Sequence, residues 1–437
     1  MILGSDDKKV PQGRFSRLAR LASVGVRSGA SLLFHREAGA AGHAAEVLGQ
    51  LRGLAAKVGQ MAGYVDGLIP HEHRESWESA LGVLQAAAPR SSAAEIRALI
   101  ESELGAPIDR LFSRFDDEPV ASASIGQVHR AFLPDSLGGG EVAVKVQHPG
   151  IARAIESDLK NVGMVESMAA SLGGRRLNSA QVLAAVRDRF REELDYSLEA
   201  KRMELFRGLC NHQIRIAQVI AERSTRRVLT TSFIHGKRFA EACAASETER
   251  AGWARTMWSF LFRGNLTLGH FNADPHPGNY FFHDDGAVTF LDFGCVNPLS
   301  PNHLGLARAV HRAAIDGDER RFRAEARARL GTKPGLLEEP SLDYIRTCFE
   351  PLFKSPYRIT RAYAGSLVEG MKEMGKLSLR TPEAEQFEMP HDMVFMNRVQ
   401  FGLYSVLARL DVEVDYAQLE RDFWSEVETS NRGTPHT

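Results

Sequence analysis

The sequence predicts an α+β protein of two lobes, with strands concentrated early in the chain and helices late. The β-rich runs are Val120–Phe132, Glu141–Gln147 and Arg226–Ile234. Beyond His235 and Gly236 the pattern is mostly helical, interrupted by one short hairpin with strands NYFF and AVTFLDF around the turn HDDG. Because domains usually contain roughly 100–200 residues, a chain of 437 residues should form two or three structural units.

Composition and charge exclude several classes of protein. The net charge of −1 creates no overall field that would attract nucleic acid. The four cysteines are far apart and form no CxxC pair, which favours reduced thiols in a reducing compartment: Cys210, Cys243, Cys295 and Cys348. We find neither a run of about 20 apolar residues nor a secretory signal, so we expect a cytoplasmic protein without a transmembrane segment.

The first quarter of the chain predicts helices. Residues 1–13 form a polar tail, and 14–36 form a basic stretch that suits either a membrane surface or packing on the domain. Residues 42–66 have the apolar spacing of a helix, and residues 71–112 look helical with a break near Pro89.

The stretch from Gly269 to Gly294 carries the strongest chemical signal. Asp274 and Asn279 have the spacing D-x-x-x-x-N, and Asp292 begins a DFG tripeptide on the other side of the hairpin. Phosphoryl transfer needs magnesium, which prefers oxygen ligands. We therefore predict that Asn279 and Asp292 bind Mg²⁺ and that Asp274 orients or deprotonates an attacking hydroxyl or water. A zinc or iron cluster is the alternative: His270, Asp274, His276 and His283.

A lysine and a glutamate complete this chemistry. Lys145 lies in the strand VAVKV, similar to the V-A-I-K strand whose lysine holds nucleotide phosphates and pairs with a helix glutamate. The alternative is an edge-strand lysine that faces solvent. Asp195 and Glu199 are four residues apart on one predicted helix face, and a cation such as Lys145 would relieve their repulsion.

The segment PVASASIGQVHRA replaces the usual glycine-rich phosphate loop. Its turn holds two alanines and two serines, with Gly126 following. Alanine reaches positive φ less readily than glycine, so this loop should hold phosphates in a different geometry from that of ordinary protein kinases.

Together these residues resemble the UbiB/ADCK (AarF) family of atypical kinase-like proteins, over about residues 42–300. AAKVGQ is similar to the family's KxGQ motif, ASASIGQVH to its alanine-rich loop, and EELDYSLEA to its ExD motif. The resemblance implies a protein-kinase-like fold with a helical extension that blocks peptide substrates. It also implies ATP and magnesium as cofactors and a link to ubiquinone or other isoprenoid-quinone biosynthesis.

The resemblance assigns roles by position in this sequence. The catalytic residues are Asp274, Lys145 and Glu199, the metal ligands Asn279 and Asp292, and the regulatory residues Lys57, Gln60, Glu193 and Asp195. The nucleotide contacts are Ala121, Ser122, Ala123, Ser124, Ile125, Gly126, Gln127, Lys145, Ser232 and Ile234. The implied domains are a basic segment (1–41), the KxGQ extension (42–115), an N-lobe (116–235) and a helical C-lobe (236–437).

Two departures from the family accompany these assignments. Asn272 stands where many members have histidine, and the chain lacks the C-terminal transmembrane helices of some bacterial members, which leaves peripheral membrane contact as a hypothesis. Quinone-precursor lipids and other quinone-biosynthesis enzymes are the implied partners. The leading hypothesis is an ATPase or small-molecule phosphotransferase. A nucleotide-gated scaffold or lipid-binding module without turnover is the runner-up, and a relative of antibiotic or choline kinases ranks last.

Overall fold

The computed structural model describes residues 91–122, 125–156, 191–381 and 391–432. Within these residues the chain forms two compact units. The first contains the residues up to 197 together with 220–232, and the second contains 198–219 and the residues from 233 onward. The predicted basic segment, the KxGQ helix and its residues Lys57 and Gln60 lie outside the described residues.

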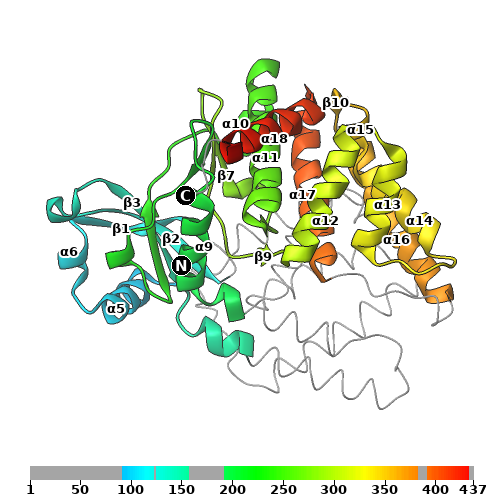
Figure 1. Ribbon diagram of the computed structural model, residues 1–437. Coiled ribbons are helices and arrows are strands. Elements are labelled where there is room, and N and C mark those ends of the chain that lie inside the picture. Colours follow the sequence, from blue (N-terminus) through cyan, green and yellow to red (C-terminus); the bar gives the residue numbers. More distant parts are fainter. Residues whose placement is uncertain (1–90, 123–124, 157–190, 382–390, 433–437) are drawn as a thin grey trace, which may run out of the picture. The chain divides into compact units, whose positions relative to one another are not determined.

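The first unit is built on an antiparallel sheet with strand order β1-β2-β3-β5 (Figure 1). Its strands are β1 (Arg114–Ser122), β2 (Gly126–Phe132), β3 (Glu141–Gln147) and β5 (Val228–Ser232). The short helices are α5 (Ala93–Leu104), α6 (Ile108–Leu111), η2 (Asp135–Leu137) and η3 (Ala221–Arg223). In β3, Val142, Val144 and Val146 are buried, whereas Lys145 between them belongs to the other face of the sheet.

Helix α5 covers the apolar face of this sheet. A capping box starts the helix at Ser92: the Ser92 hydroxyl accepts from the Glu95 N–H, and the Glu95 carboxylate accepts from the Ser92 N–H. Ile96 and Ile100 are fully buried and belong to the same core cluster as the three valines of β3. Burial of apolar side chains at about 25 cal/mol per Å² therefore holds helix and sheet together.

The strand predictions found two of the four strands of this sheet and merged the other two into one. Glu141–Gln147 is confirmed as a strand, and Val228–Ser232 forms the core of the predicted run Arg226–Ile234. The single strand expected from Val120 to Phe132 was wrong, because β1 ends at Ser122 and β2 begins at Gly126. Residues 121 and 122 pair with 128 and 127, so the two described sides of the alanine-rich segment are antiparallel.

The second unit is mainly helical. Its helices are α9 (Tyr196–Arg207, whose first two residues belong to the first unit), α10 (Phe239–Cys243), α11 (Glu247–Arg263), the π-helical turn η4 (Gly264–Leu268), η5 (Pro277–Asn279), α12 (Pro301–Ile315), α13 (Glu319–Leu330), α14 (Glu338–Cys348), α15 (Glu350–Phe353), α16 (Arg361–Arg380), α17 (His391–Leu410) and α18 (Tyr416–Arg432). This confirms the helical prediction for the described residues beyond 300.

Short strands position the loops of this unit. They are β4 (Ile214–Ile216), β6 (His270–Asn272), β7 (Tyr280–Phe282), β8 (Val288–Phe290), β9 (Val296–Pro298), β10 (Tyr357–Arg358) and β11 (Glu413–Val414). β7 and β8 form the predicted hairpin. Sequence patterns did not reveal that β4 joins β8 in parallel or that β6 pairs with β9.

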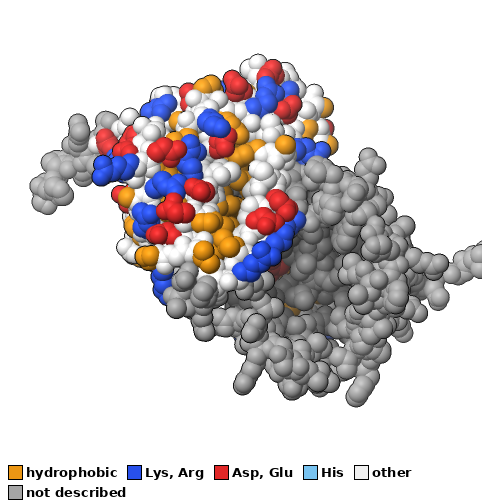
Figure 2. Space-filling model, turned by 90° about the vertical axis from the view of Figure 1, so that its right-hand side faces the viewer, with side chains coloured by type: hydrophobic (Ala, Val, Ile, Leu, Met, Phe, Trp, Pro, Cys, Tyr) orange, Lys and Arg blue, Asp and Glu red, His pale blue; other side chains and the backbone are white. Residues whose placement is uncertain are grey.

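The outer face of the second unit carries charges of both signs. Figure 2 shows lysine or arginine and acidic side chains interspersed on this face, with hydrophobic side chains between them. Arg323 pairs with Asp343, Arg327 with Glu338, and Arg346 with Glu319. Exposed pairs of this kind contribute only about 0–1 kcal/mol each. No helix in the described ranges combines the length and apolar character required to cross a bilayer.

Gly126 yields a test of the first unit. A Cβ atom at this position would lie 2.4 Å from the Val146 carbonyl oxygen and 2.8 Å from the Tyr196 hydroxyl. We expect Gly126→Ala to lower the free energy of unfolding by about 1–3 kcal/mol, because the backbone of β3 must move. Gly305→Ala, in open space on α12, is the matched control. Denaturant unfolding measures the free energy of unfolding of both variants. Equal stability of the two would contradict the close approach of Gly126 to β3.

Candidate active site

Two short ladders in the second unit bring together the predicted acidic and amide residues. Asp274 follows β6, Asn279 ends η5 directly before β7, and Asp292 follows β8. β6 pairs with β9, and β7 pairs with β8. The loop that carries Asp274 and Asn279 and the loop that carries Asp292 are therefore joined at both of their ends. The backbone bond from Ala273 N–H to Cys295 O, at 2.7 Å, extends the first ladder to the residue before Asp274.

The Asn272 side chain joins the two loops. Its Nδ2 donates to the Asp292 carbonyl oxygen at 2.5 Å, and its Oδ1 accepts from the Asp274 N–H at 3.2 Å. An amide has both a donor and an acceptor, so one side chain can hold both acidic residues by their backbones. Asn272, noted above as a departure from the family, thus has a clear supporting role here.

The catalytic loop is closed by further hydrogen bonds. The His276 N–H donates to the Asp274 carbonyl at 2.8 Å, and Asn279 Nδ2 donates to the same oxygen at 3.2 Å. The Leu291 N–H donates to the Asn279 carbonyl at 3.0 Å, which ties the loop to the end of β8. Because its Nδ2 donates to the backbone, the atom of the Asn279 side chain that could ligate a metal is Oδ1.

The carboxylates of Asp274 and Asp292 act on a common neighbour. Tyr280 is buried, and its pKa is raised far above the usual value, first by burial and then by the negative charges of Asp274 and Asp292. Tyr280 therefore stays a neutral phenol at physiological pH. The negative potential that the two carboxylates place on Tyr280 would also attract a cation.

The DFG segment is anchored by its aromatic residue. Phe293 is fully buried, with its ring centroid 5.1 Å from Phe206 of α9 and 6.2 Å from Phe260 of α11. Arg202 donates to the Gly294 carbonyl at 2.9 Å, and the Gly294 N–H donates to Asp292 Oδ1 at 2.8 Å. These contacts fix the Asp292 carboxylate by one of its two oxygens.

The donor set fits magnesium better than a softer metal. Asn279 and Asp292 offer amide and carboxylate oxygens, the hard ligands that Mg²⁺ prefers. Over the described ranges, no three His, Cys, Asp or Glu side chains are grouped as a metal centre. The alternative zinc or iron cluster is therefore wrong, although all four of its residues are described: His270, Asp274, His276 and His283.

In the first unit, Lys145 lies on an inner strand. β3 is paired with β2 on one side and β5 on the other, so the alternative of an edge-strand lysine is wrong. The side chain is half-buried, and its Nζ lies 4.9 Å from the centroid of the Tyr196 ring. A cation held over an aromatic face on a rigid strand is well placed to meet phosphate charge.

The alanine-rich loop has a polar support beneath it. Gln127 is 1% exposed, and its amide contacts His129 Nε2 at 2.8 Å and accepts from the Ser91 N–H at 3.0 Å. Its side chain is thus occupied inside the unit, whereas Ile125 and Gly126 are buried at the start of β2. Ala121 is exposed and Ser122 is half-buried at the end of β1. Ala123 and Ser124 lie outside the described residues.

The ExD segment is not one continuous helix. α9 begins at Tyr196, and Asp195 precedes it, accepting from the Ser197 N–H at 3.1 Å and lying 3.6 Å from Arg226. The expected shared helix face of Asp195 and Glu199 is therefore wrong, because the chain turns at Leu194 and Asp195 to cap the new helix. Glu193 is half-buried ahead of this turn, and Glu199 is 4% exposed in the first turn of α9.

The remaining predicted nucleotide contacts follow β5. Ser232 is the last residue of β5 and pairs with Val142 of β3. Ile234 lines an open pocket of about 420 Å³ in the second unit, whose polar lining includes Arg207, Arg215 and His235. Ser232 and Ile234 belong to different compact units.

Comparison with known proteins gives the family. Residues 83–326, more than half of the chain, match the ABC1 atypical kinase-like domain. The chain belongs to this family. The predicted UbiB/ADCK membership and the kinase-like α+β fold are thereby confirmed, since the relatives of this ABC1 protein include aarF-domain kinases and COQ8 proteins.

Several relatives show how far the similarity extends. Uncharacterized protein Rv0647c of Mycobacterium tuberculosis is 36% identical over 52% of this chain and 48% of its own length. Protein ACTIVITY OF BC1 COMPLEX KINASE 8, chloroplastic, of Arabidopsis thaliana is 31% identical over 58% of this chain and 34% of its own. Atypical kinase COQ8, mitochondrial, of Saccharomyces cerevisiae is 26% identical over 86% of this chain and 74% of its own length. This ABC1-family chain thus matches about half or less of the length of the first two relatives.

A solved structure supports the fold over most of the chain. The complex of Rv3197 with erythromycin from Mycobacterium tuberculosis is similar with a TM-score of 0.62 and 28% identity. The similarity covers 92% of this chain and 97% of that one.

The sequence did not reveal which helix packs against the loop that contains Asp274. Gly402 of α17 lies against Pro275, and a Cβ at Gly402 would be 2.2 Å from the Pro275 Cγ. Gly402 lies far along the sequence from the segment that contains Asp274 and Asn279, so local patterns gave no signal for this contact. A glycine inside an otherwise apolar predicted helix was the one available hint of close approach.

Gly402→Ala tests this contact. The new methyl group must displace Pro275, and with it Asp274, so we expect faster amide exchange at His276 and Asn279 and a lower melting temperature. At Gly365 of α16 no atom lies within 4 Å of an added Cβ. Gly365→Ala should therefore leave amide exchange unchanged and keep or slightly raise the melting temperature. Hydrogen exchange read by NMR distinguishes the variants. Unchanged exchange in Gly402→Ala would show that α17 does not support the loop.

Proposed function

We propose that this ABC1-family protein is an ATP- and magnesium-dependent enzyme, an ATPase or small-molecule phosphotransferase that supports ubiquinone or isoprenoid-quinone biosynthesis. The observation that carries the proposal is the Asn272 bridge, which holds the Asp274 and Asp292 backbones together. A protein that only binds a partner has no need to fix a candidate base beside a metal-binding carboxylate.

The residues of the second unit have distinct roles in this proposal. Asn279 and Asp292 would hold Mg²⁺, which neutralises phosphate charge as it develops. Asp274, held by its backbone at N–H and C=O, orients the attacking hydroxyl or water and accepts its proton. Phe293, buried against Phe206 and Phe260, keeps the Asp292 carboxylate from swinging away.

The first unit supplies most of the proposed nucleotide contacts, and the second unit supplies Glu199 and Ile234. Lys145 on the inner strand β3 holds phosphates, and Glu199 is the proposed carboxylate partner that keeps it oriented. Ala121, Ser122 and Ile125 are proposed phosphate contacts, while the Gln127 side chain is held by His129 and Ser91 and so fixes the start of β2. Ser232 and Ile234 are the proposed contacts for the base. Lys57 and Gln60, with Glu193 and Asp195, are proposed to regulate access.

The biological role rests on the family resemblance and on relatives named COQ8. Quinone-precursor lipids and other quinone-biosynthesis enzymes are the proposed partners, with contact at the membrane surface. The alternative is a nucleotide-gated scaffold without turnover. The alanine-rich loop favours that alternative, because it lacks the glycines of ordinary phosphate loops.

Phosphate release from ATP tests the proposal. With Mg²⁺ and a detergent-solubilised phenolic lipid we expect turnover by the natural protein and at least a hundredfold loss in Asp274→Asn, since general base catalysis contributes roughly 10²–10⁴-fold. Asp285→Asn, at the turn of the same hairpin, is the control and should keep its activity. If neither the natural protein nor either variant releases phosphate although ATP still binds, the enzyme proposal fails and the scaffold alternative is favoured.

A further inference from the structure

Strand β2 carries two polar side chains into the interior of the first unit. Gln127 and His129 are 1% and 0% exposed, and each pairs in register with a buried valine of β3. Directly paired residues project from the same face of a sheet, so both side chains face the apolar core under α5. Lys145 pairs with Val128 and belongs to the opposite face. Any effect of Gln127 or His129 on a nucleotide held by Lys145 is therefore indirect.

A chain of hydrogen bonds runs through these two side chains from one backbone group to another. His129 Nδ1 contacts the Asp116 carbonyl oxygen at 2.9 Å, and His129 Nε2 contacts Gln127 Nε2 at 2.8 Å. At the other end, the Ser91 N–H donates to Gln127 Oε1 at 3.0 Å. A carbonyl oxygen only accepts and a backbone N–H only donates, so the two ends fix the direction of every bond between them.

One protonation state of His129 satisfies this chain. Nδ1 must carry a proton to donate to Asp116, and Nε2 must be bare to accept from the Gln127 amide. A second proton on the ring would point Nε2–H at the NH₂ group of Gln127, donor against donor. Turning the Gln127 amide over would only move this conflict to the Ser91 N–H. Protonation of His129 therefore breaks a buried hydrogen bond, where water cannot replace the lost partner.

The charged groups around His129 come from β1 and α5, because β3 places valines beside it. Asp117 and Glu118 on β1 favour the protonated ring, whereas Arg97 on α5 opposes it. Burial has the largest effect and holds the pKa of His129 below the usual 6.5. The ring is thus neutral above pH 6.5, and it gains its second proton only as the pH falls below that value.

Ser91 also holds the backbone on the other side of Gly126. Its hydroxyl contacts Nδ1 of the buried His148 at 2.9 Å, and the His148 N–H donates to the Ile125 carbonyl at 2.9 Å. Gly126 lies so close to β3 that an added Cβ would be 2.4 Å from a backbone oxygen of that strand. A displacement of Gln127 is therefore passed on to Ile125 and Gly126, two of the proposed nucleotide contacts.

We propose that His129 is a positioning residue for the nucleotide contacts at the start of β2 and that its protonation lowers nucleotide affinity. The neutral ring holds the Gln127 amide and keeps Ile125 and Gly126 in place, whereas the doubly protonated ring releases the amide. This regulation rests on the proposed nucleotide function. The hydrogen-bond chain beneath it does not, and it can be measured without nucleotide.

Nitrogen NMR of the imidazole rings in the full chain tests the hydrogen-bond chain. Without nucleotide and at neutral pH, His129 should show a protonated Nδ1 and a bare Nε2, and it should gain its second proton only below pH 6.5. A neutral ring that carries its proton on Nε2, or a ring already doubly protonated at neutral pH, would overturn the proposal.

Nucleotide affinity gives the second measurement. The probe is the magnesium complex of the non-hydrolysable ATP analogue AMP-PNP, titrated by calorimetry from about pH 7.5 to about pH 5, on both sides of the ordinary histidine pKa. We expect the natural protein to bind roughly tenfold more weakly at the acid end, because one buried hydrogen bond is lost. His212→Asn, at an exposed histidine of the second unit, is the control and should show the same loss.

Gln127→Glu should reverse the requirement. A carboxylate accepts from the Ser91 N–H and also from a protonated Nε2, so the doubly protonated His129 then completes the chain. The pKa of His129 should rise, and the variant should keep its affinity at the acid end. Protonation of the probe itself is the same for every variant, so the difference between variants isolates the effect of His129.

The natural protein decides the question even if Gln127→Glu fails to fold. Its affinity must fall over the same pH range in which the NMR signal of His129 reports the second proton. A fall at another pH, or an equal fall in a folded Gln127→Glu variant, would overturn the regulation alone. No binding of the probe at neutral pH would overturn the proposed nucleotide function, and the regulation with it, even if His129 has the expected proton on Nδ1.

Discussion

The candidate site depends on the side chain of Asn272. Two backbone groups from separate loops, the Asp274 N–H and the Asp292 carbonyl, meet on this one amide. The β6–β9 and β7–β8 ladders connect the flanks of the same two loops, and the Asn272 amide adds the side-chain link next to the two carboxylates themselves. The pairing of β6 with β9 brings Asn272 to this point, so backbone topology and side-chain chemistry act together.

The surrounding structure reinforces this frame with apolar contacts. Phe293 is enclosed by Phe206 and Phe260, and Pro275 rests on Gly402. These contacts arise from α9, α11 and α17, which lie far apart in the sequence. The functional loop is therefore carried by a rigid helical core, as precise positioning of catalytic groups requires.

Local patterns predicted the segments better than their partners. The alternation in VAVKV and the hairpin around HDDG were sufficient to place β3, β7 and β8, because period-two burial is written in neighbouring residues. The parallel pairing of Ile214 with Val288 joins residues too distant for any local signal. The start of α9 at Tyr196 was missed because a helical apolar pattern continues through the turn at Asp195.

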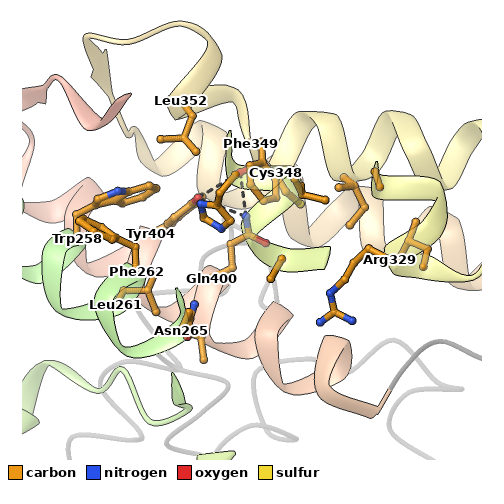
Figure 3. A pocket seen from close by; sticks show the side chains of 17 residues that line it. Trp258, Leu261, Phe262, Asn265, Arg329, Cys348, Phe349, Leu352, Gln400 and Tyr404 are labelled. Atoms are coloured by element: carbon orange, nitrogen blue, oxygen red, sulfur yellow. Dashed lines mark hydrogen bonds between the residues drawn. The ribbon is translucent and has the colours of Figure 1, made fainter. Parts of the chain in front are cut away.

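The same contrast applies to the site. Asp274, Asn279 and Asp292 were recognisable because their order and spacing carry the chemistry. In contrast, the pocket lined by Trp258, Leu352 and Tyr404, among others, is formed by side chains from six helices and the η4 turn (Figure 3). The existence of this pocket depends on packing, which spacing along the chain does not encode. The zinc or iron alternative failed for a related reason, since histidines close in sequence need not converge in space.

The most direct test of the joined metal site replaces Mg²⁺ by paramagnetic Mn²⁺ in the presence of ATP and follows backbone amide signals by NMR. Mn²⁺ should broaden Asn279 and Gly294 together and spare Gly305 and Gly365 on α12 and α16. In Asn272→Ala, a higher Mn²⁺ concentration should be needed to broaden both signals equally, because one link that positions the two loops is lost. Broadening that spares Asn279 and Gly294 in the natural protein, or that is unchanged in the variant, would contradict the account.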